Sequence, residues 1–201
     1  MIYSGRLNFN CGVMGSNKSV SIIIQAYNLN RDGIGTRILK PSVDTRSDKI
    51  WSRALGKGIP CEIVSKINVK DFKDDKEHPA IIIDEGQFLT REDVENLATL
   101  ADEYDKMIDI YGLLADRNQK LFPGSQALLE VGAHFVQMIS VKCNVFGCCR
   151  DATHHVYFNP DTGLPEFGGG HIKIGSDAFK SVCRQHYRYI RKALLPWEKV
   201  R

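Results

Sequence analysis

The stretch Gly12-Val13-Met14-Gly15-Ser16-Asn17-Lys18-Ser19 decides the fold class of this chain. It follows an alternating apolar segment, residues 2–10, and precedes a helical pattern over residues 18–30. A glycine-rich loop between a strand and a helix turns backbone N–H groups and the positive end of the helix toward phosphates. In such a loop Lys18 reaches the terminal phosphates and Ser19 binds magnesium. The alternative is an ordinary glycine-rich turn before a helix.

Asn17 departs from the usual pattern of this loop, in which glycine directly precedes the lysine. Asparagine is the non-glycine residue best able to adopt a positive φ angle. We therefore expect the loop to keep its conformation, with an added side chain that crowds the phosphates.

Outward from the loop, strands and helices alternate to about residue 141. We expect strands at residues 2–10, 36–39, 61–64, 80–83, 107–113 and 138–141, and helices at residues 18–30, 91–104 and 126–135. Residues 42–60 are expected to be irregular, and residues 71–79 to form a loop or a short exposed helix. This alternation predicts an α/β fold with a mostly parallel sheet and crossover helices, in a nucleotide-binding domain over residues 1–141.

The composition changes after residue 141 toward cysteine, histidine and glycine. We expect a second, smaller domain over residues 142–201, which ends in a helix from Asp177 to about Leu195. Four cysteines fall in this part, and His186 stands three residues after the last of them, Cys183. In a chain without a visible signal peptide, clustered cysteine and histidine indicate a metal site rather than disulfides.

Zinc prefers four sulfur or nitrogen ligands in a tetrahedron, and the candidate ligands are Cys143, Cys148, Cys183 and His186. Cys149 competes with Cys148 for the second place. Four protein ligands leave no open position, so the expected role is structural. A second metal at His154 and His155 is the less simple interpretation, because a solvent-facing strand or a base-pocket contact also explains them.

An apolar run at residues 80–83 ends in two carboxylates, Asp84 and Glu85. In phosphate-loop proteins an acid at this place orders Mg²⁺, and a second carboxylate can take the proton from an attacking hydroxyl. A strand that simply emerges into solvent would also carry acids here. The joint occurrence of this strand end and the loop about 65 residues earlier favours a nucleotide-binding domain.

The bulk composition favours no other class. The 201 residues are 43% hydrophobic and 25% charged, with a formal net charge of +3. So small an excess does not favour nucleic-acid binding, and a DNA- or RNA-binding zinc module has only the cysteine cluster in its support. No targeting segment and no apolar run long enough to span a bilayer is visible, so we expect a cytoplasmic protein.

Further motifs run through nearly the whole chain. They are Lys40-Pro41-Ser42-Val43-Asp44-Thr45-Arg46, Ser52-Arg53, Asp84-Glu85-Gly86-Gln87-Phe88-Leu89, Tyr111-Gly112-Leu113, Leu121-Phe122-Pro123-Gly124-Ser125 and Ser181-Val182-Cys183-Arg184-Gln185-His186. In order and spacing they resemble the zinc-containing thymidine kinases of bacteria, animals, poxviruses and phages. The resemblance implies transfer of the ATP γ-phosphate to the 5′-hydroxyl of thymidine or a related pyrimidine deoxynucleoside.

The resemblance also implies roles for individual residues. Glu85 is the general base, with Lys18 and Arg46 as further catalytic residues. The implied nucleotide- and magnesium-binding residues are Gly12, Gly15, Ser16, Asn17, Lys18, Ser19, Asp84 and Gln87. The implied substrate-binding residues are Met14, Asp44, Phe88, Arg117, Phe122, His155, Ile172, Ile174 and Phe179. A lasso loop at about residues 168–179 closes over the base, and the family usually forms homotetramers.

The same resemblance favours Cys148 over Cys149, because Cys148 stands five residues before Thr153, where the family's second cysteine falls. Departures from the family pattern are Asn17, Leu114 for an arginine, Arg117 for an aromatic residue and Phe179 for a tyrosine. They suit a phage protein with an altered choice of pyrimidine. The alternative is a catalytically impaired homologue that binds nucleotide in a regulatory role.

Overall fold

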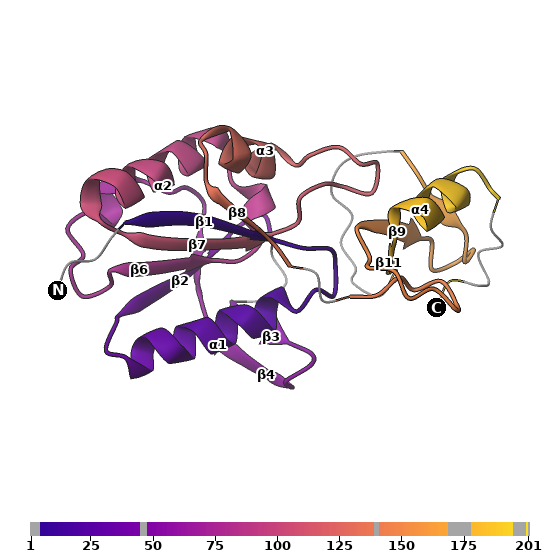
Figure 1. Ribbon diagram of the computed structural model, residues 1–201. Helices are drawn as coiled ribbons and strands as arrows, with labels where there is room; N and C mark the ends of the chain where they lie inside the picture. The colour runs from indigo at the N-terminus through magenta and orange to yellow at the C-terminus, as the bar shows by residue number, and fades with distance from the viewer. Residues whose placement is uncertain (1–4, 45–47, 139–140, 169–177, 195–199, 201) are drawn as a thin grey trace. The chain divides into compact units, whose positions relative to one another are not determined.

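The computed structural model describes residues 5–44, 48–138, 141–168, 178–194 and 200. These residues group into two compact units (Figure 1). The first comprises Met1–Cys11, Asn17–Gly112 and Pro123–Gln137, and the second comprises Gly12–Ser16, Leu113–Phe122 and Met138–Arg201. The boundary expected at residues 141 and 142 stays a prediction.

The first unit is built on a six-stranded sheet in the order β5-β2-β6-β7-β1-β8. All of its strand pairs are parallel. The strands are β1 (Arg6–Cys11), β2 (Thr36–Pro41), β5 (Glu62–Val64), β6 (Ala80–Ile83), β7 (Met107–Gly112) and β8 (His134–Gln137). The α/β fold with a parallel sheet is therefore confirmed.

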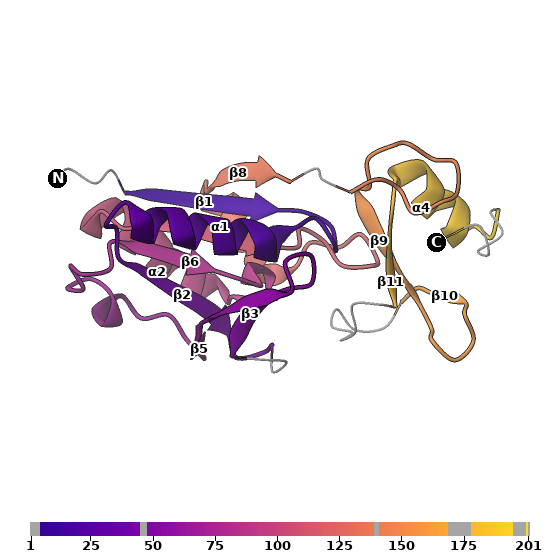
Figure 2. The ribbon, with the colours of Figure 1, turned by 90° about the horizontal axis from the view of Figure 1, so that it is seen from below.

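Three helices cover the two faces of this sheet. They are α1 (Lys18–Arg31), α2 (Arg91–Tyr104) and α3 (Pro123–Glu130). Two short 3₁₀ turns, η1 (Val69–Asp71) and η2 (Gly86–Phe88), precede and follow β6. The connection from β1 to β2 runs toward one edge of the sheet, whereas those from β6 to β7 and from β7 to β8 run toward the other. Because parallel crossovers are right-handed, α1 lies on one face and α2 and α3 lie on the opposite face (Figures 1 and 2).

Every residue of β6 and β7 is buried, as expected for central parallel strands that are covered on both faces. The predicted strand at residues 80–83 and the predicted helix at residues 91–104 are confirmed at both ends. Helix α2 begins with a capping box, in which the Thr90 side chain accepts from the Asp93 N–H and the Asp93 carboxylate accepts from the Thr90 N–H.

The stretch at residues 42–60, expected to be irregular, contains an antiparallel hairpin of β3 (Lys49–Ser52) and β4 (Lys57–Pro60). Burial alternates along β3, where Ile50 and Ser52 face inward. Only one of these two inward residues is apolar, so the sequence lacks the alternation of apolar and polar residues that would have predicted this strand.

The predicted helix at residues 126–135 is confirmed over residues 126–130, but α3 begins and ends earlier, at Pro123 and Glu130. The strand predicted at residues 138–141 was misplaced, because β8 lies at His134–Gln137 and neither Met138 nor Val141 belongs to a strand, while residues 139 and 140 lie outside the described residues. Pro123 begins α3, a position where its missing N–H costs nothing. Gly132, with φ 78°, ends the helix in a Schellman motif, since its N–H bonds to Leu129 O and that of Ala133 bonds to Leu128 O. The strand β8 then follows at once.

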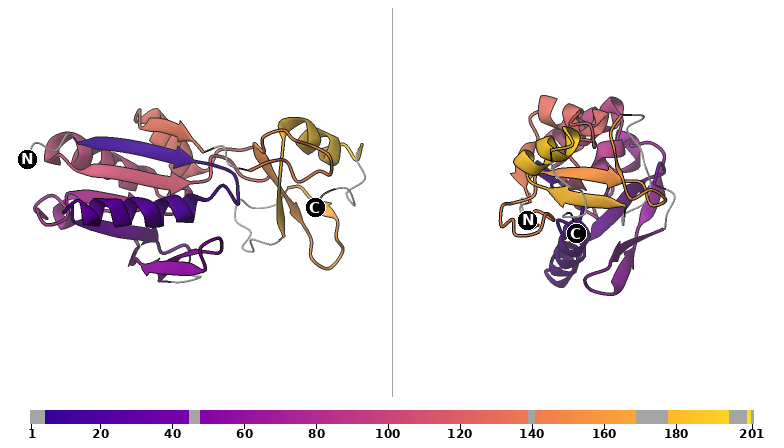
Figure 3. Two further views of the ribbon diagram at one scale, coloured as in Figure 1. Left: turned by 60° about the horizontal axis from the view of Figure 1, so that its bottom comes forward. Right: turned by 90° about the vertical axis from the view of Figure 1, so that its right-hand side faces the viewer.

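The second unit contains a three-stranded antiparallel sheet in the order β10-β9-β11 and one helix, α4 (Arg184–Arg191) (Figures 2 and 3). The strands are β9 (His154–Phe158), β10 (Pro165–Glu166) and β11 (Phe179–Val182). The predicted helix from Asp177 to about Leu195 was wrong over its first part, because β11 pairs with β9 there. The core of this unit consists of Cys143, Val145, Val156, Val182, Cys183, Tyr187 and Ile190.

Candidate nucleotide site and metal centre

The loop between β1 and α1 adopts the conformation that its sequence predicts. Asn17 has φ 63° and ψ 24°, the left-handed region, and Gly15 has φ 79°. The Asn17 side chain is exposed and makes no capping hydrogen bond, while its carbonyl accepts from Ser21 N at 3.0 Å. Asparagine therefore takes the backbone conformation of the glycine that it replaces, and such left-handed residues are typical of anion-binding backbone nests.

The start of the loop is tightly packed. Ser16 is fully buried, and its N–H donates to Val13 O at 3.2 Å. A Cβ atom at Gly12 would lie 2.2 Å from Ser16 Oγ and 3.0 Å from Met138 O. Only glycine fits at residue 12, because its neighbours include backbone that cannot move aside.

The two carboxylates after β6 are held in a defined geometry. Asp84 is buried, and its Oδ1 accepts from the Glu85 N–H at 2.9 Å. Glu85 has φ 55° and ψ 38°, an uncommon conformation for a non-glycine residue that costs on the order of 1 kcal/mol or more. Its Oε2 accepts from Gln87 Nε2 at 2.6 Å, and Gln87 is itself buried. The strained backbone and the amide together fix the direction of the Glu85 side chain.

Lys18 shares an electrostatic environment with this acid pair. Burial lowers the pKa of Lys18, and the negative charges of Glu85 and Asp84 oppose that change. Burial, together with the charge of Glu85, raises the pKa of Asp84 to about 7, while Lys18 and Lys40 act in the opposite direction. Two close carboxylates with too little compensating positive charge are an environment that suits a divalent cation.

Lys40 is a site residue that sequence reasoning missed. Its Nζ lies 3.0 Å from Asp44 Oδ2, and both side chains are almost completely buried. A lysine that directly follows the apolar pair Ile38-Leu39 in a strand was the available signal. The ion pair fixes Asp44, whereas Arg46, the other predicted residue of this motif, lies outside the described residues.

Several predicted substrate-binding residues gather in the second unit. Arg117, Phe122 and His155 are buried there. The Phe179 ring lies 5.6 Å from that of His155 and 5.1 Å from that of Tyr157, a neighbour not predicted from sequence. Phe88 belongs to the first unit and is partly buried, and Ile172 and Ile174 lie outside the described residues.

The phosphate loop is also tied to β11 within the second unit. The Ser181 hydroxyl donates a 2.7 Å hydrogen bond to the backbone carbonyl of Met14. Ser181 pairs with His155 across the sheet, and Phe179 pairs with Tyr157. Because side chains alternate along a strand, these four residues lie on one face of the small sheet, the face that holds Met14.

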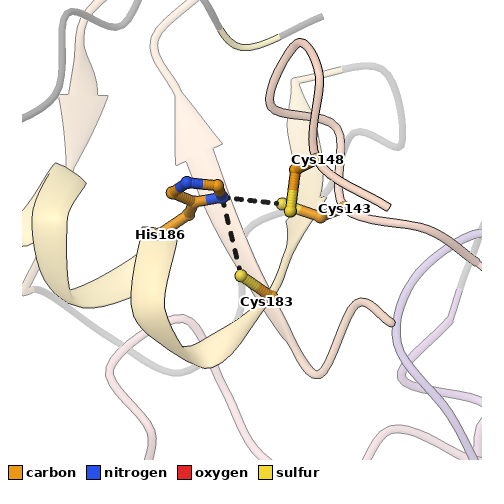
Figure 4. Close-up of side chains that lie close together, drawn as sticks. All are labelled: Cys143, Cys148, Cys183 and His186. Atoms are coloured by element: carbon orange, nitrogen blue, oxygen red, sulfur yellow. Dashed lines mark hydrogen bonds between the residues drawn. The ribbon is translucent and has the colours of Figure 1, made fainter. Parts of the chain in front are cut away.

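The four predicted zinc ligands lie together (Figure 4). One donor atom from each of Cys143, Cys148, Cys183 and His186 falls within 4.8 Å of every other. His186 Nδ1 lies 3.2 Å from Cys143 Sγ and 3.5 Å from Cys183 Sγ. Tetrahedral zinc with Zn–S bonds of about 2.3 Å has sulfur atoms about 3.8 Å apart, so this cluster matches its dimensions.

The protonation chemistry of the cluster also fits a metal. Burial raises the pKa of Cys143 to about 11. Burial would also raise the pKa of Cys148, but hydrogen bonds from the Arg150 backbone and from the other two thiols lower it. Burial lowers the pKa of His186, which keeps its imidazole neutral and able to bind a metal. The donor set is thus suited to Zn²⁺, which takes the place of the thiol protons.

The alternative ligands lie elsewhere. Cys149 is exposed and is no member of the cluster. His154 stacks on Tyr187, with ring centroids 4.8 Å apart. Within the described ranges, neither His154 nor His155 belongs to a group of potential metal ligands.

Comparison with known proteins agrees with this geometry. The sequence model of the family described as thymidine kinase matches residues 5–187. The chain belongs to the thymidine kinase family. It is 31% identical to the thymidine kinase of Enterobacteria phage T4, an alignment that covers 94% of this chain and 98% of that protein.

Bacterial members of the thymidine kinase family are similar to the chain at the same level. The Streptococcus gordonii thymidine kinase is 34% identical, over 90% of this chain and 95% of that protein. The Coxiella burnetii thymidine kinase is 31% identical, over 91% and 95% respectively. The chain is thus a nucleoside kinase, and its family implies the use of ATP. Among the residues that the structure describes, no helix is both long and apolar enough to cross a membrane.

Proposed function

We propose that this thymidine kinase family member transfers the γ-phosphate of ATP to the 5′-hydroxyl of thymidine or a related pyrimidine deoxynucleoside. The observation that carries the proposal is the fixed acid pair. Asp84 and Glu85 follow a fully buried strand and share their electrostatic surroundings with Lys18. Phosphoryl transfer needs such a carboxylate for the nucleophile and a lysine for the phosphates.

The residues of the phosphate loop and of the turn after β6 each have a distinct task in this proposal. Glu85 accepts the proton of the 5′-hydroxyl, and the Gln87 amide holds its carboxylate in place. Lys18 binds the terminal phosphates, and Arg46 supports it as a further catalytic residue. The backbone of Gly12, Gly15, Ser16 and Asn17 cradles the phosphates.

Asp84 and the Ser19 hydroxyl are the residues that would hold Mg²⁺, and the buried, incompletely compensated carboxylate of Asp84 fits that role. When bound, Mg²⁺ supplies positive charge to the phosphate oxygens.

The residues that the family resemblance assigns to the nucleoside keep that role in the proposal. They are Met14, Asp44, Phe88, Arg117, Phe122, His155, Ile172, Ile174 and Phe179. Zinc at Cys143, Cys148, Cys183 and His186 has a structural role, because four protein ligands fill its tetrahedron. A cytoplasmic homotetramer without nucleic-acid or membrane partners completes the proposal.

A catalytically impaired homologue was the alternative, and Asn17 was one of its two motives. The left-handed conformation of Asn17 and its exposed side chain support an active loop instead. Arg117 was the second reason for that alternative, but this residue bears on which base is bound and not on phosphoryl transfer.

The test is ATP consumption by Glu85→Gln with Mg²⁺ and a panel of pyrimidine deoxynucleosides. Loss of a general base lowers turnover by about 10²- to 10⁴-fold while leaving ATP affinity near that of the wild type. Glu92→Gln is the matched control, because Glu92 is an exposed carboxylate on α2 that pairs with a surface lysine, Lys66. Equal turnover in both variants would overturn the role of Glu85, and no turnover in the wild type would overturn the function.

A further inference from the structure

Arg117 is a buried cation with an unusual set of contacts. Only 4% of the residue is exposed. Its Nε and Nη2 both donate to the carbonyl of Gly168, at 3.1 Å for Nε, and its own carbonyl accepts from the Tyr187 hydroxyl at 2.6 Å. The next residue, Asn118, accepts the Gly168 N–H at 2.7 Å. Residues 117 and 118 thus hold both backbone groups of Gly168.

One nitrogen of the guanidinium, Nη1, does not contribute to the hydrogen bonds with Gly168. Arg117 Nη1 is buried and finds no hydrogen-bond partner in the described part of the chain. No carboxylate in those ranges forms an ion pair with Arg117 either. A buried donor without a partner destabilises the fold, and more so when it is charged. Such a donor is maintained at a cost that a bound acceptor would remove.

The surroundings of Arg117 belong to the aromatic face of the small sheet. Its guanidinium carbon lies 5.9 Å from the centroid of the Tyr157 ring. Tyr157 contacts Phe179, which contacts His155. Ser181, on the same face, bonds to Met14 of the phosphate loop. A planar, partly polar ligand that also reaches the phosphate loop is the kind of molecule that suits this face.

We propose that Arg117 Nη1 donates a hydrogen bond to an oxygen acceptor on the pyrimidine base and so determines which base the kinase prefers. This inference rests on the proposed function, because it assigns the specificity of the same site. The acceptor is either a ring carbonyl or an oxygen-bearing substituent at the 5-position. A guanidinium suits this task, because its donors have a fixed geometry and its charge is permanent.

Two variants separate specificity from the hold on Gly168. Arg117→Met keeps the length of an apolar stem but removes every donor, whereas Asn118→Ala removes only the second contact to Gly168. A role limited to holding Gly168 predicts that both variants change kcat/KM by a common factor for all nucleosides. A role in base recognition predicts that Arg117→Met alone changes the ratios between nucleosides.

The substrates are thymidine, 5-hydroxymethyldeoxyuridine, 2-thiothymidine and 4-thiothymidine. Sulfur is a weak hydrogen-bond acceptor. If Nη1 donates to a ring carbonyl, wild-type kcat/KM should fall for the analogue in which sulfur replaces that oxygen. If Nη1 donates to a substituent at the 5-position, kcat/KM should rise for the hydroxymethyl analogue. We expect a discrimination of about 10- to 100-fold, from a charged hydrogen bond, that is lost in Arg117→Met, mainly through KM. Unchanged ratios in Arg117→Met would overturn the inference.

A binding measurement keeps the inference distinct from the proposed function. The increase in Tm caused by each free nucleoside without ATP should follow the same order in the wild type and flatten in Arg117→Met. Zinc content serves as the check that each variant is folded. If Arg117→Met lacks zinc, it is replaced by Arg117→Lys, which keeps the positive charge but not the planar set of guanidinium donors. If the wild type is an active kinase but Arg117→Met and Arg117→Lys leave the ratios of kcat/KM between nucleosides unchanged, only the inference is refuted. If the folded wild type shows no turnover, the proposed function is refuted.

Discussion

The side-chain amide of Gln87 donates a 2.6 Å hydrogen bond to the carboxylate of Glu85, two residues earlier in the chain. Both residues belong to the turn after β6, and Gln87 is buried while Glu85 is partly exposed. The contact links a rigid interior group to the proposed base. It gives Gln87 the task of positioning that base.

Replacement of Gln87 by methionine should lower kcat by about 10-fold with little change in the KM for ATP. The shape is nearly kept, but the donor to a charged carboxylate, worth about 1.5 to 3 kcal/mol, is lost. Steady-state kinetics test this. Asn96→Leu, which removes the amide bond to Ile67 O elsewhere in the same unit, is the control and should leave kcat unchanged. An equal loss in both variants would assign Gln87 a merely structural role.

Asp84 should make the stability of the magnesium-free protein depend on pH. Its pKa is raised from 3.8 to about 7 in the fold, so its favourable contribution is complete below about pH 4 and is lost as the pH rises through 7. Asp84→Asn removes the charge and should raise Tm relative to the wild type at pH 8 but not at pH 4. Thermal denaturation without added Mg²⁺ measures this, and a Tm difference that is the same at both pH values would contradict it.

Zinc should be present at one ion per chain, and Cys148→Ser should lose it. Because binding energy at a structural zinc site is folding energy, the variant should unfold in the second unit, which a chelator should also cause in the wild type. Cys149→Ser is the matched control, since that thiol is exposed and lies outside the cluster. Elemental analysis and circular dichroism check both variants. Retained zinc in Cys148→Ser with loss in Cys149→Ser would reverse the ligand choice.

Asn17→Ala should destabilise the protein by about 1 to 2 kcal/mol, because alanine adopts the left-handed conformation only at that cost. Asn17→Gly should fold with nearly wild-type stability and retain kinase activity. Asn30→Ala, at an exposed position inside α1, is the control and should be neutral or slightly stabilising. Urea denaturation measures all three, and equal stabilities of Asn17→Ala and Asn17→Gly would show that the left-handed backbone carries no strain.

Sequence patterns predicted the elements in which local signals agree. The run Ala80–Ile83 is aliphatic throughout, and α2 combines helical spacing with a capping box at Thr90. The strand at Phe179–Val182 was missed because it exists through pairing with β9, more than twenty residues away, which no local pattern reveals.

The same distinction holds for the site. Cysteine and histidine spacing pointed to the metal cluster, since few residue types bind zinc and all four come from two short segments. The burial of Lys40 against Asp44 and the contact of Tyr157 with Phe179 depend on tertiary packing. The hold of residues 117 and 118 on Gly168 joins segments about fifty residues apart, so spacing carries no trace of it.

The grouping of residues 12–16 and 113–122 with the zinc-bearing segment decides where this protein can be divided. The chain passes between the two units five times, after residues 11, 16, 112, 122 and 137. A fragment that begins at residue 138 therefore contains all four metal ligands but lacks two of the three segments of its own compact unit. Truncation at a single boundary separates neither unit in complete form.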